Sequence, residues 1–340
     1  MTQPDRLSRR RVLHHLATLG VMSVVPPGVV AATDAGLDWQ PAAPLPIATQ
    51  ELYPVVHDGR LVVAGGIAAR LRVPYFTDRS FAYDADQDRW QELPRLPQPI
   101  HHAALVSGPD GLELMGGFHG GYTHLWRMRD AIHRLQDGRW ERRGSLPVPQ
   151  AEGVLSVAPD GALHLVTGQS PRGNANRQRS DHQETTAHWR RAPGAARWEA
   201  AAPIPTARNS ASGGWLGETL VIAGGRTAEG NLSHTERYDA QEDRWRTGAP
   251  LPLPQAGTAA VVHEDTLIVL GGEIFVPQAG VFPNVWRYDG AQDRWQALPD
   301  LRTPRHGLGA GLLGKRLHAI GGATEPSGNG TSNANEYLLL

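Results

Sequence analysis

One octapeptide occurs twice in this chain with a single difference. The sequence QDRWQELP at residues 87–94 returns as QDRWQALP at residues 292–299, and shorter copies that end in Arg-Trp lie between them. Each copy follows an apolar run that ends in two small residues. These pairs occupy positions 65–66, 116–117, 167–168, 224–225, 271–272 and 321–322, and all but the Thr-Gly pair at 167–168 are two glycines. Successive pairs lie 47 to 57 residues apart, which predicts six copies of one supersecondary unit.

The residues around each glycine pair predict four short strands per unit. The chain holds 39 glycines and 27 prolines, a composition that favours turns and short strands over long helices. The apolar runs into the glycines, such as residues 61–64 and 267–270, are expected to be strands, and turns such as Asp58-Gly59 precede them. A Tyr-Asp pair marks the third strand and the Arg-Trp pair marks the fourth. The sequence therefore predicts an all-β chain.

This combination of a glycine pair, Tyr-Asp and Trp resembles the kelch repeat, whose unit is one four-stranded blade of a β-propeller. The resemblance implies a six-bladed kelch propeller in which aromatic side chains fill the space between blades. The expected blades span about residues 49–95, 100–145, 150–202, 208–250, 256–300 and 306–340. The last blade lacks an Arg-Trp pair, and Trp39 supplies the missing aromatic. We therefore expect residues 37–42 to join the last blade and to close the ring.

The first 31 residues have the features of an export signal. The sequence SRRRVL at residues 8–13, followed by an apolar run at residues 16–25, resembles the twin-arginine signal. That run is too short and too interrupted for a permanent membrane anchor. We expect residues 32–340 to be the mature propeller, located in the periplasm or secreted.

Several function classes are excluded by composition. The chain has no cysteine, so disulfides, thiolate metal sites and the cysteine-crosslinked tyrosine of the copper radical oxidases that share kelch propellers are all ruled out. Acidic and basic residues are nearly equal in number, at 34 and 33, so nucleic acid is not an expected partner. The histidines lack the spacing of a local chelating motif. We expect neither a metal nor another cofactor.

The long links of the predicted blades run from each glycine pair, at the end of the second strand, to the third strand. Loops after the second and fourth strands of an antiparallel blade lie on the same face, so these links surround one end of the central channel. Arginines, carboxylates, amides and aromatics on that rim suit a small polar or anionic, sugar-like molecule. Glu273 and Arg226 directly follow glycine pairs and are the expected catalytic residues. The expected ligand-binding residues are Arg208, Arg305, Gln150, Gln255, His101, His119, Tyr122, His124, Arg177 and His306.

Among exported bacterial kelch proteins, the chain is similar to the N-acetylneuraminate epimerases, or sialate mutarotases, which interconvert the anomers of sialic acid. The resemblance implies that Glu273 acts as an acid or base and that an arginine holds the sugar carboxylate. The family carries its arginine a few residues beyond the glutamate, where residues 274–278 have none. Arg226, Arg208 or Arg305 would then supply it from adjoining blades.

A second function class stays open beside this isomerase. The same rim of a propeller can grip a ligand or a periplasmic protein without catalysis, as a binding scaffold. The fold does not separate the two classes, because propellers host both.

Overall fold

The computed structural model describes residues 30–31, 37–70, 73–119 and 125–340. Apart from one turn of 3₁₀ helix, η1 (Arg179–Asp181), the regular elements in these residues are strands, which confirms the prediction of an all-β chain. The predicted export signal lies outside the described residues except for β1 (Val30–Ala31), which pairs in parallel with β33 (Arg294–Leu298). None of the described segments forms a helix that could cross a bilayer.

Most of the described strands belong to six sheets built around four antiparallel strands each, as the repeat predicts. The first three are β4 (Val55–His57), β5 (Arg60–Ala64), β8 (Ser80–Asp84) and β9 (Arg89–Leu93); β10 (Ala104–Gly108), β11 (Gly111–Met115), β14 (Ala131–Gln136) and β15 (Arg139–Ser145); and β16 (Val154–Val157), β17 (Leu163–Val166), β20 (His188–Arg191) and β21 (Glu199–Ala200). The others are β22 (Ser212–Leu216), β23 (Thr219–Ala223), β26 (Thr235–Asp239) and β27 (Arg244–Gly248); β28 (Ala259–His263), β29 (Thr266–Leu270), β32 (Val285–Asp289) and β33; and β34 (Gly309–Leu313), β35 (Arg316–Ile320) and β36 (Asn335–Leu339) with β2 (Gln40–Pro41).

Short hairpins follow the second strand of the first five sheets. They are β6 (Ile67–Arg70) with β7 (Val73–Phe76), β12 (Phe118–His119) with β13 (Arg127–Met128), β18 (Gln169–Pro171) with β19 (His182–Glu184), β24 (Arg226–Thr227) with β25 (Gly230–Asn231), and β30 (Glu273–Ile274) with β31 (Gly280–Val281). The first hairpin also pairs with β3 (Thr49–Gln50). These hairpins, and the loop after β35, are the segments that can reach over the channel.

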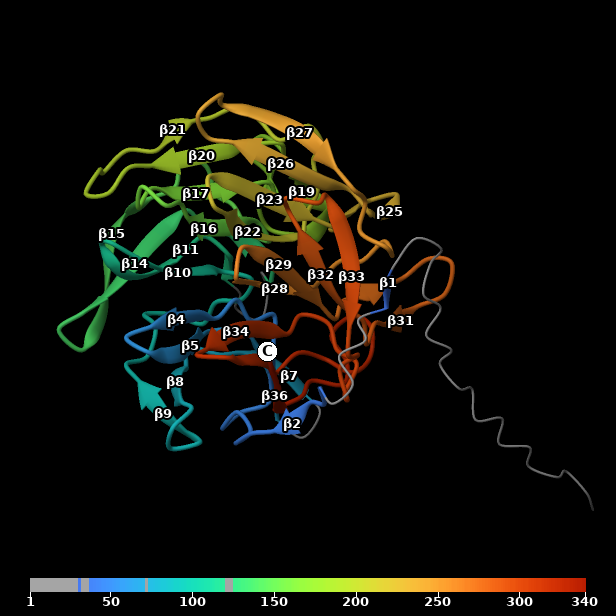
Figure 1. Cartoon of the computed structure of the whole chain (residues 1–340). Coiled ribbons are helices and arrows are strands. Elements are labelled where there is room, and N and C mark those ends of the chain that lie inside the picture. The colour runs from blue at the N-terminus through green and yellow to red at the C-terminus, as the bar shows by residue number, and fades with distance from the viewer. Residues whose placement is uncertain (1–29, 32–36, 71–72, 120–124) are drawn as a thin grey trace, which may run out of the picture.

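The sheets are arranged around a common centre, with their first strands nearest to it (Figure 1). Those strands contact one another in the order β4, β10, β16, β22, β28 and β34, and β34 contacts β4. The central residues of the second strands are buried in every sheet, and all four side chains of residues 267–270 are fully buried. This arrangement is consistent with a kelch propeller.

The glycine pairs bind each sheet to the next. Gly271 has φ of +69°, and a Cβ at this position would lie 2.5 Å from the carbonyl oxygen of Arg305, which belongs to the following repeat. The N–H of Gly272 donates to that same carbonyl at 2.8 Å. A side chain would therefore displace the neighbouring backbone, so glycine is required here by both conformation and space.

The repeated octapeptide makes a second contact between sheets. Trp90 donates its indole N–H to the carbonyl oxygen of Ala43 at 2.8 Å, and Asp88 accepts the N–H of Ala43 at 2.7 Å. Asp88 also accepts the Tyr83 hydroxyl at 2.7 Å. Tyr, Asp and Trp of one repeat thus hold both backbone groups of a residue in the preceding sheet, which explains why these three residue types recur together.

The N-terminal strand takes the place of the missing Arg-Trp unit. In β2, Gln40 lies opposite Tyr337 and Pro41 opposite Glu336 of the antiparallel strand β36. Trp39, just before β2, is fully buried and donates to the carbonyl oxygen of Pro299 at 3.0 Å. The first described strand after residue 31 is therefore the fourth strand of the last sheet.

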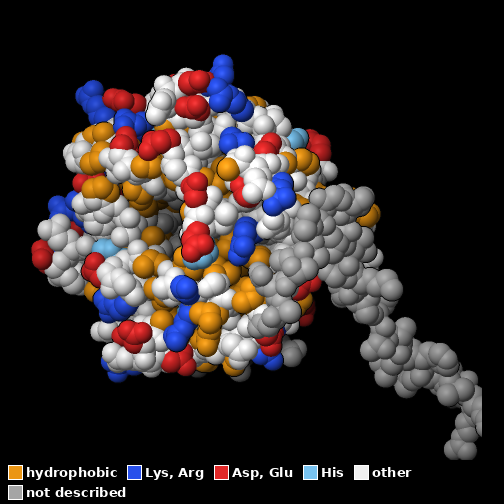
Figure 2. Space-filling model, viewed as in Figure 1, with side chains coloured by type: hydrophobic (Ala, Val, Ile, Leu, Met, Phe, Trp, Pro, Cys, Tyr) orange, Lys and Arg blue, Asp and Glu red, His pale blue; other side chains and the backbone are white. Residues whose placement is uncertain are grey.

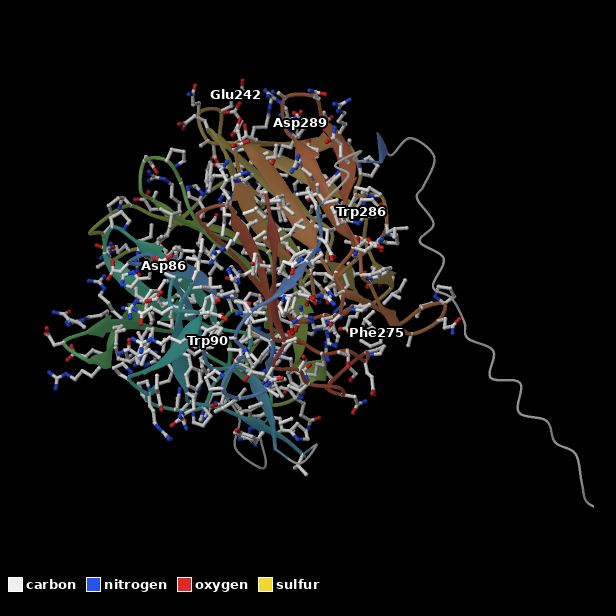
Figure 3. All side chains as sticks on the ribbon, turned by 60° about the horizontal axis from the view of Figure 1, so that its bottom comes forward. Asp86, Trp90, Glu242, Phe275, Trp286 and Asp289 are labelled. Atoms are coloured by element: carbon white, nitrogen blue, oxygen red, sulfur yellow. The ribbon has the colours of Figure 1, made fainter. Side chains whose placement is uncertain are left out.

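Charged side chains of both signs are interspersed over the face that Figure 2 presents. The turns that join the first strand of a sheet to the second, and the third to the fourth, lie at one end of the strands. The hairpins that follow the second strands lie at the other end. Figure 3 places Phe275, in the β30–β31 hairpin, far from Glu242 and Asp289, which lie where third strands turn into fourth strands. The site described next lies at the hairpin end.

Candidate functional site

Six residues at one repeat position surround the channel axis, each two to four residues before the first strand of its sheet. They are Glu51, His102, Glu152, Ser210, Gly257 and Gly307, and all six have φ between +53° and +66°. Four backbone hydrogen bonds of 2.6 to 3.1 Å join them in sequence from Glu152 through Ser210, Gly257 and Gly307 to Glu51. The shared backbone conformation turns the side chains of this position toward one place. A Cβ on Gly307 would lie 2.7 Å from Glu51 Oε1, so the glycine leaves room for that carboxylate.

One half of the site is an imidazole between two carboxylates. His102 Nε2 lies 3.1 Å from Glu51 Oε2 and 3.7 Å from Glu152 Oε1. Ser210 donates its hydroxyl to the other oxygen of Glu152 at 2.8 Å. Behind His102, His101 Nδ1 lies 2.6 Å from His102 Nδ1 and fixes the orientation of its ring.

The other half of the site is an arginine, a glutamate and a histidine from three different repeats. Arg226 Nη1 lies 2.6 Å from Glu273 Oε1, and His306 Nε2 lies 3.5 Å from Glu273 Oε2. The N–H of Ser327 also donates to Glu273, at 2.9 Å. His306 Nδ1 is 3.9 Å from Glu51 Oε1, which joins the two halves. We call the whole group the axial cluster: Glu51, His102, Glu152, Ser210, Arg226, Glu273 and His306.

The charges of the axial cluster stabilise one another. Burial alone would raise the pKa of Glu51 and of Glu152, but His102 and Arg226 outweigh it and hold both pKa values below the usual 4.5. Burial opposes the charge of His102, yet Glu51 and Glu152 raise its pKa above 6.5. Likewise, Glu152, Glu273 and Glu51 raise the pKa of Arg226 against the effect of burial. A buried group of mutually shifted acids and bases at a channel mouth is typical of a functional site.

Two spaces adjoin the cluster. Below it, the channel holds a cavity of about 120 Å³ whose lining includes Tyr53, Gly153 and Ser212. Beside it, a groove of about 710 Å³ runs between the first hairpin and the loop 324–333. Glu325 in that loop accepts a hydrogen bond from His306 Nε2 at 3.0 Å, so the groove and the cluster share a wall.

Four of the predicted ligand-binding residues share one repeat position, as expected, but their side chains face away from the cluster. Arg208 and Arg305 are fully buried and lie 2.7 Å from Glu236 and Glu336, the second residues of their own third strands. The side-chain amides of Gln150 and Gln255 donate to the backbone carbonyls of Thr167 and Gly271. In the described structure these four side chains bind protein groups within their own sheets.

The remaining predicted residues are distributed around the rim. His306, Glu273 and Arg226 belong to the axial cluster, and His101 lies behind it, stacked on Phe76 at 4.3 Å. His119 Nδ1 lies 2.9 Å from the carbonyl oxygen of Pro99, and Arg177 is exposed in the loop between β18 and β19. The predicted residues Tyr122 and His124 lie outside the described residues.

Glu51, His102, Glu152 and Ser210 are the site residues that the sequence prediction did not select. Each lies two residues after the repeat position of Gln150, Arg208, Gln255 and Arg305, so the repeat aligned them correctly. Their residue types differ from copy to copy, and no local motif marks them. Across the described ranges, no group of three or more histidine and carboxylate side chains is arranged to hold a metal ion.

The comparisons with known proteins agree with this architecture. The kelch motif model matches residues 207–252. "Kelch-like protein terF" of Aspergillus terreus is 28% identical over 252 residues, which cover 69% of this chain and 52% of that protein. "Kelch-like protein 35" of Mus musculus is 27% identical over 239 residues, which cover 66% and 37%. The chain thus spans about half, or less, of the length of these curated relatives.

A solved structure described as "Structure of YjhT" matches with a TM-score of 0.71 and covers 87% of this chain and 96% of that one. The sequence identity in this match is 15%, so the likeness concerns the fold alone. The described chain has the propeller-like fold of that structure and carries a kelch repeat.

Proposed function

We propose that this kelch-repeat protein binds a small sugar at the axial cluster and catalyses the exchange between its anomers. The observation that carries the proposal is the position of His102 between two carboxylates at the channel axis, 3.7 Å from Glu152 Oε1. Glu152 Oε1 is buried and accepts no hydrogen bond from the described residues. A charged imidazole and a carboxylate oxygen with no donor, side by side, are a general acid and a general base.

Anomer exchange needs such a pair because both proton transfers occur at oxygens bonded to one carbon. Glu152 takes the proton of the anomeric hydroxyl, and His102 gives its Nε2 proton to the ring oxygen. The bond between the anomeric carbon and the ring oxygen breaks, and a carbonyl forms. After rotation about the adjacent bond, the ring closes on the other face, the ring oxygen's proton returns to His102 and Glu152 returns its proton to the new anomeric hydroxyl. General acid–base catalysis of this kind contributes roughly 10² to 10⁴ in rate.

The other cluster members position these two groups. Glu51, 3.1 Å from His102, favours the charged imidazole, and Ser210 orients Glu152. Glu273, which the resemblance implies as the acid or base, is bound to Arg226 and to the N–H of Ser327. We therefore assign Glu273 to holding Arg226 and the loop that carries Ser327 in place.

Two further proposals concern the whole chain. We infer that the pairing of β2 with β36 closes the ring, supported by the cyclic contacts of the first strands and by the Trp39 hydrogen bond. We also propose export to the periplasm, supported by the twin-arginine-type sequence at residues 8–13.

The test is the rate of anomer exchange measured by NMR with and without protein, using D-galactose, D-glucose and N-acetylneuraminate. We expect acceleration by the wild type, a loss of about 10² or more in Glu152→Gln, and no loss in Glu264→Gln, an exposed carboxylate in the turn between β28 and β29. Acceleration of none of the three sugars would overturn the proposal.

A non-catalytic scaffold is the alternative that one observation favours. Phe275 and Val276 are exposed at the tip of the β30–β31 hairpin, with exposed fractions of 43% and 68%. Apolar side chains at a hairpin tip can dock a protein. Sugar binding without any exchange between anomers would mean that the protein is a non-catalytic scaffold.

A further inference from the structure

Two buried polar atoms of the axial cluster accept no hydrogen bond from the described residues. Glu152 Oε1 belongs to a fully buried side chain, and His306 Nδ1 belongs to a side chain that is 1% exposed. His306 donates from Nε2 to the carbonyl oxygen of Glu325, so in the tautomer with its proton on Nε2 the ring presents Nδ1 as an acceptor. Glu152 Oε1 and this Nδ1 can both accept from a ligand donor, such as a hydroxyl group or an ammonium group.

The cluster also has three carboxylates and a single guanidinium. Glu51, Glu152 and Glu273 face Arg226 and the imidazoles of His102 and His306. The one guanidinium in the cluster lies 2.6 Å from Glu273 and its Nε donates to Asn209. A ligand carboxylate would have to compete with Glu273 for Arg226 while it approached Glu51 and Glu152 in a buried site, where like charges repel strongly.

Another cation lies at the rim. The guanidinium of Arg179 is 5.0 Å from the ring centre of Trp126, and its charge lowers the pKa of Glu152. Arg179 is exposed, so its attraction for an anion is screened by solvent. It offsets part of the negative charge of the cluster and does not convert it into an anion site.

We propose that the axial cluster takes an uncharged sugar, whose hydroxyl groups donate to Glu152 and His306, and discriminates against sugar acids. This substrate class rests on the function proposed above. It differs from the sugar acid that the sequence resemblance implies, because there an arginine must be free to hold the carboxylate, whereas here Arg226 is bound to Glu273.

The test compares sugars that share a ring configuration and differ in charge: D-galactose, D-galacturonate and D-galactosamine, and the corresponding gluco series, together with N-acetylneuraminate. Binding is measured by isothermal titration calorimetry on the full mature chain, and exchange is measured by NMR. We expect the uncharged sugar to bind at least ten-fold more tightly than its acid, and the amino sugar to bind no more weakly than the uncharged one. Glu152→Gln should narrow the difference between the uncharged sugar and the acid, and Glu264→Gln should leave it unchanged.

The outcomes separate the substrate class from the function. Tighter binding or faster exchange of N-acetylneuraminate or of either uronate would overturn the substrate class and leave the isomerase proposal intact. Binding of the uncharged sugar without exchange would support the class and overturn the isomerase. Binding of no sugar would overturn both. If circular dichroism shows that Glu152→Gln is unfolded, the order in which the wild type binds the sugars is by itself the test of the substrate class.

Discussion

The indole nitrogen of Trp39 lies 3.0 Å from the carbonyl oxygen of Pro299, although 260 positions separate the two residues in the chain. The same bond joins Trp90 to Ala43 and Trp295 to Ala249, in both cases from one sheet to the preceding sheet. The N-terminal segment therefore makes the contact between sheets that the octapeptide makes elsewhere, which is the physical basis for expecting it to hold the two ends of the chain together.

Replacing Trp39 by Phe should destabilise the protein by about 1 to 3 kcal/mol, because the carbonyl of Pro299 loses its donor while most of the aromatic surface remains. Deletion of residues 32–39 should do more, since it removes the buried indole as well. Urea unfolding and size-exclusion elution check both changes. Trp295→Phe is the matched control, because it removes the equivalent hydrogen bond between two sheets at a place that does not involve the N-terminal segment. A truncated protein that melts and elutes like the intact one would show that this strand does not close the ring.

Arg305 and Glu336 form a fully buried pair within the last sheet, with 2.7 Å between Nη2 and Oε1. Arg305→Met should cost about 3 to 5 kcal/mol, because it leaves the Glu336 carboxylate buried without its partner. The double change Arg305→Met with Glu336→Leu should recover much of that loss, since neither charge then remains. Denaturant midpoints of the two variants measure the difference. Equal stability of Arg305→Met and the wild type would mean that the arginine is held for a ligand instead.

The fold could be read from the sequence because its determinants recur. Glycine pairs, Tyr-Asp and Arg-Trp appear at a near-constant spacing, and each marks a contact that every sheet makes with its neighbour. The pairing of the segment around Trp39 with the last sheet could also be predicted, because Trp39 is the one tryptophan that lies before the first glycine pair. Repetition turns a weak local signal into a strong one.

The site could be predicted only in part, for the opposite reason. Glu273 and Arg226 could be predicted because they directly follow glycine pairs, and His306 because it lies just before the first strand of the last sheet. The positive φ of Glu51 and His102 could not be predicted, because neither residue type is typical of that conformation. At this repeat position only the glycines indicate a positive φ. The sequence did not show that Arg208 and Arg305 form ion pairs inside the protein. Their partners Glu236 and Glu336 lie on the third strands, 28 and 31 residues further along the chain.

The twin-arginine-type sequence at residues 8–13 leads to a prediction that depends on sequence alone. Changing Arg9 and Arg10 together to Lys keeps the charge of the segment and removes the arginine pair that the twin-arginine pathway reads. We expect the folded protein to accumulate in the cytoplasm, as measured by cell fractionation of a bacterial host. Arg11→Lys is the matched control and should be exported. Normal export of the double variant would exclude the twin-arginine route.

The pH dependence of stability tests the charge state of His102. Because its pKa in the folded protein is raised above 6.5, mainly by Glu51 and Glu152 against burial, the charged imidazole stabilises the fold fully below pH 6.5. This stabilisation is lost as the pH rises through the folded pKa. The wild type should therefore lose stability relative to His102→Gln as the pH rises from 6.5 through the folded pKa, by roughly 1.4 kcal/mol for each pH unit that separates the two pKa values.

Urea titrations of both proteins across this range measure the effect. His263→Gln, at the end of β28 that lies away from Gly257, is the control and should keep the pH profile of the wild type. A wild type that becomes more stable than His102→Gln as the pH rises would mean that His102 is neutral when the protein is folded. The imidazole could not then supply the proton to the ring oxygen, and the acid of the proposed reaction would have to be another group.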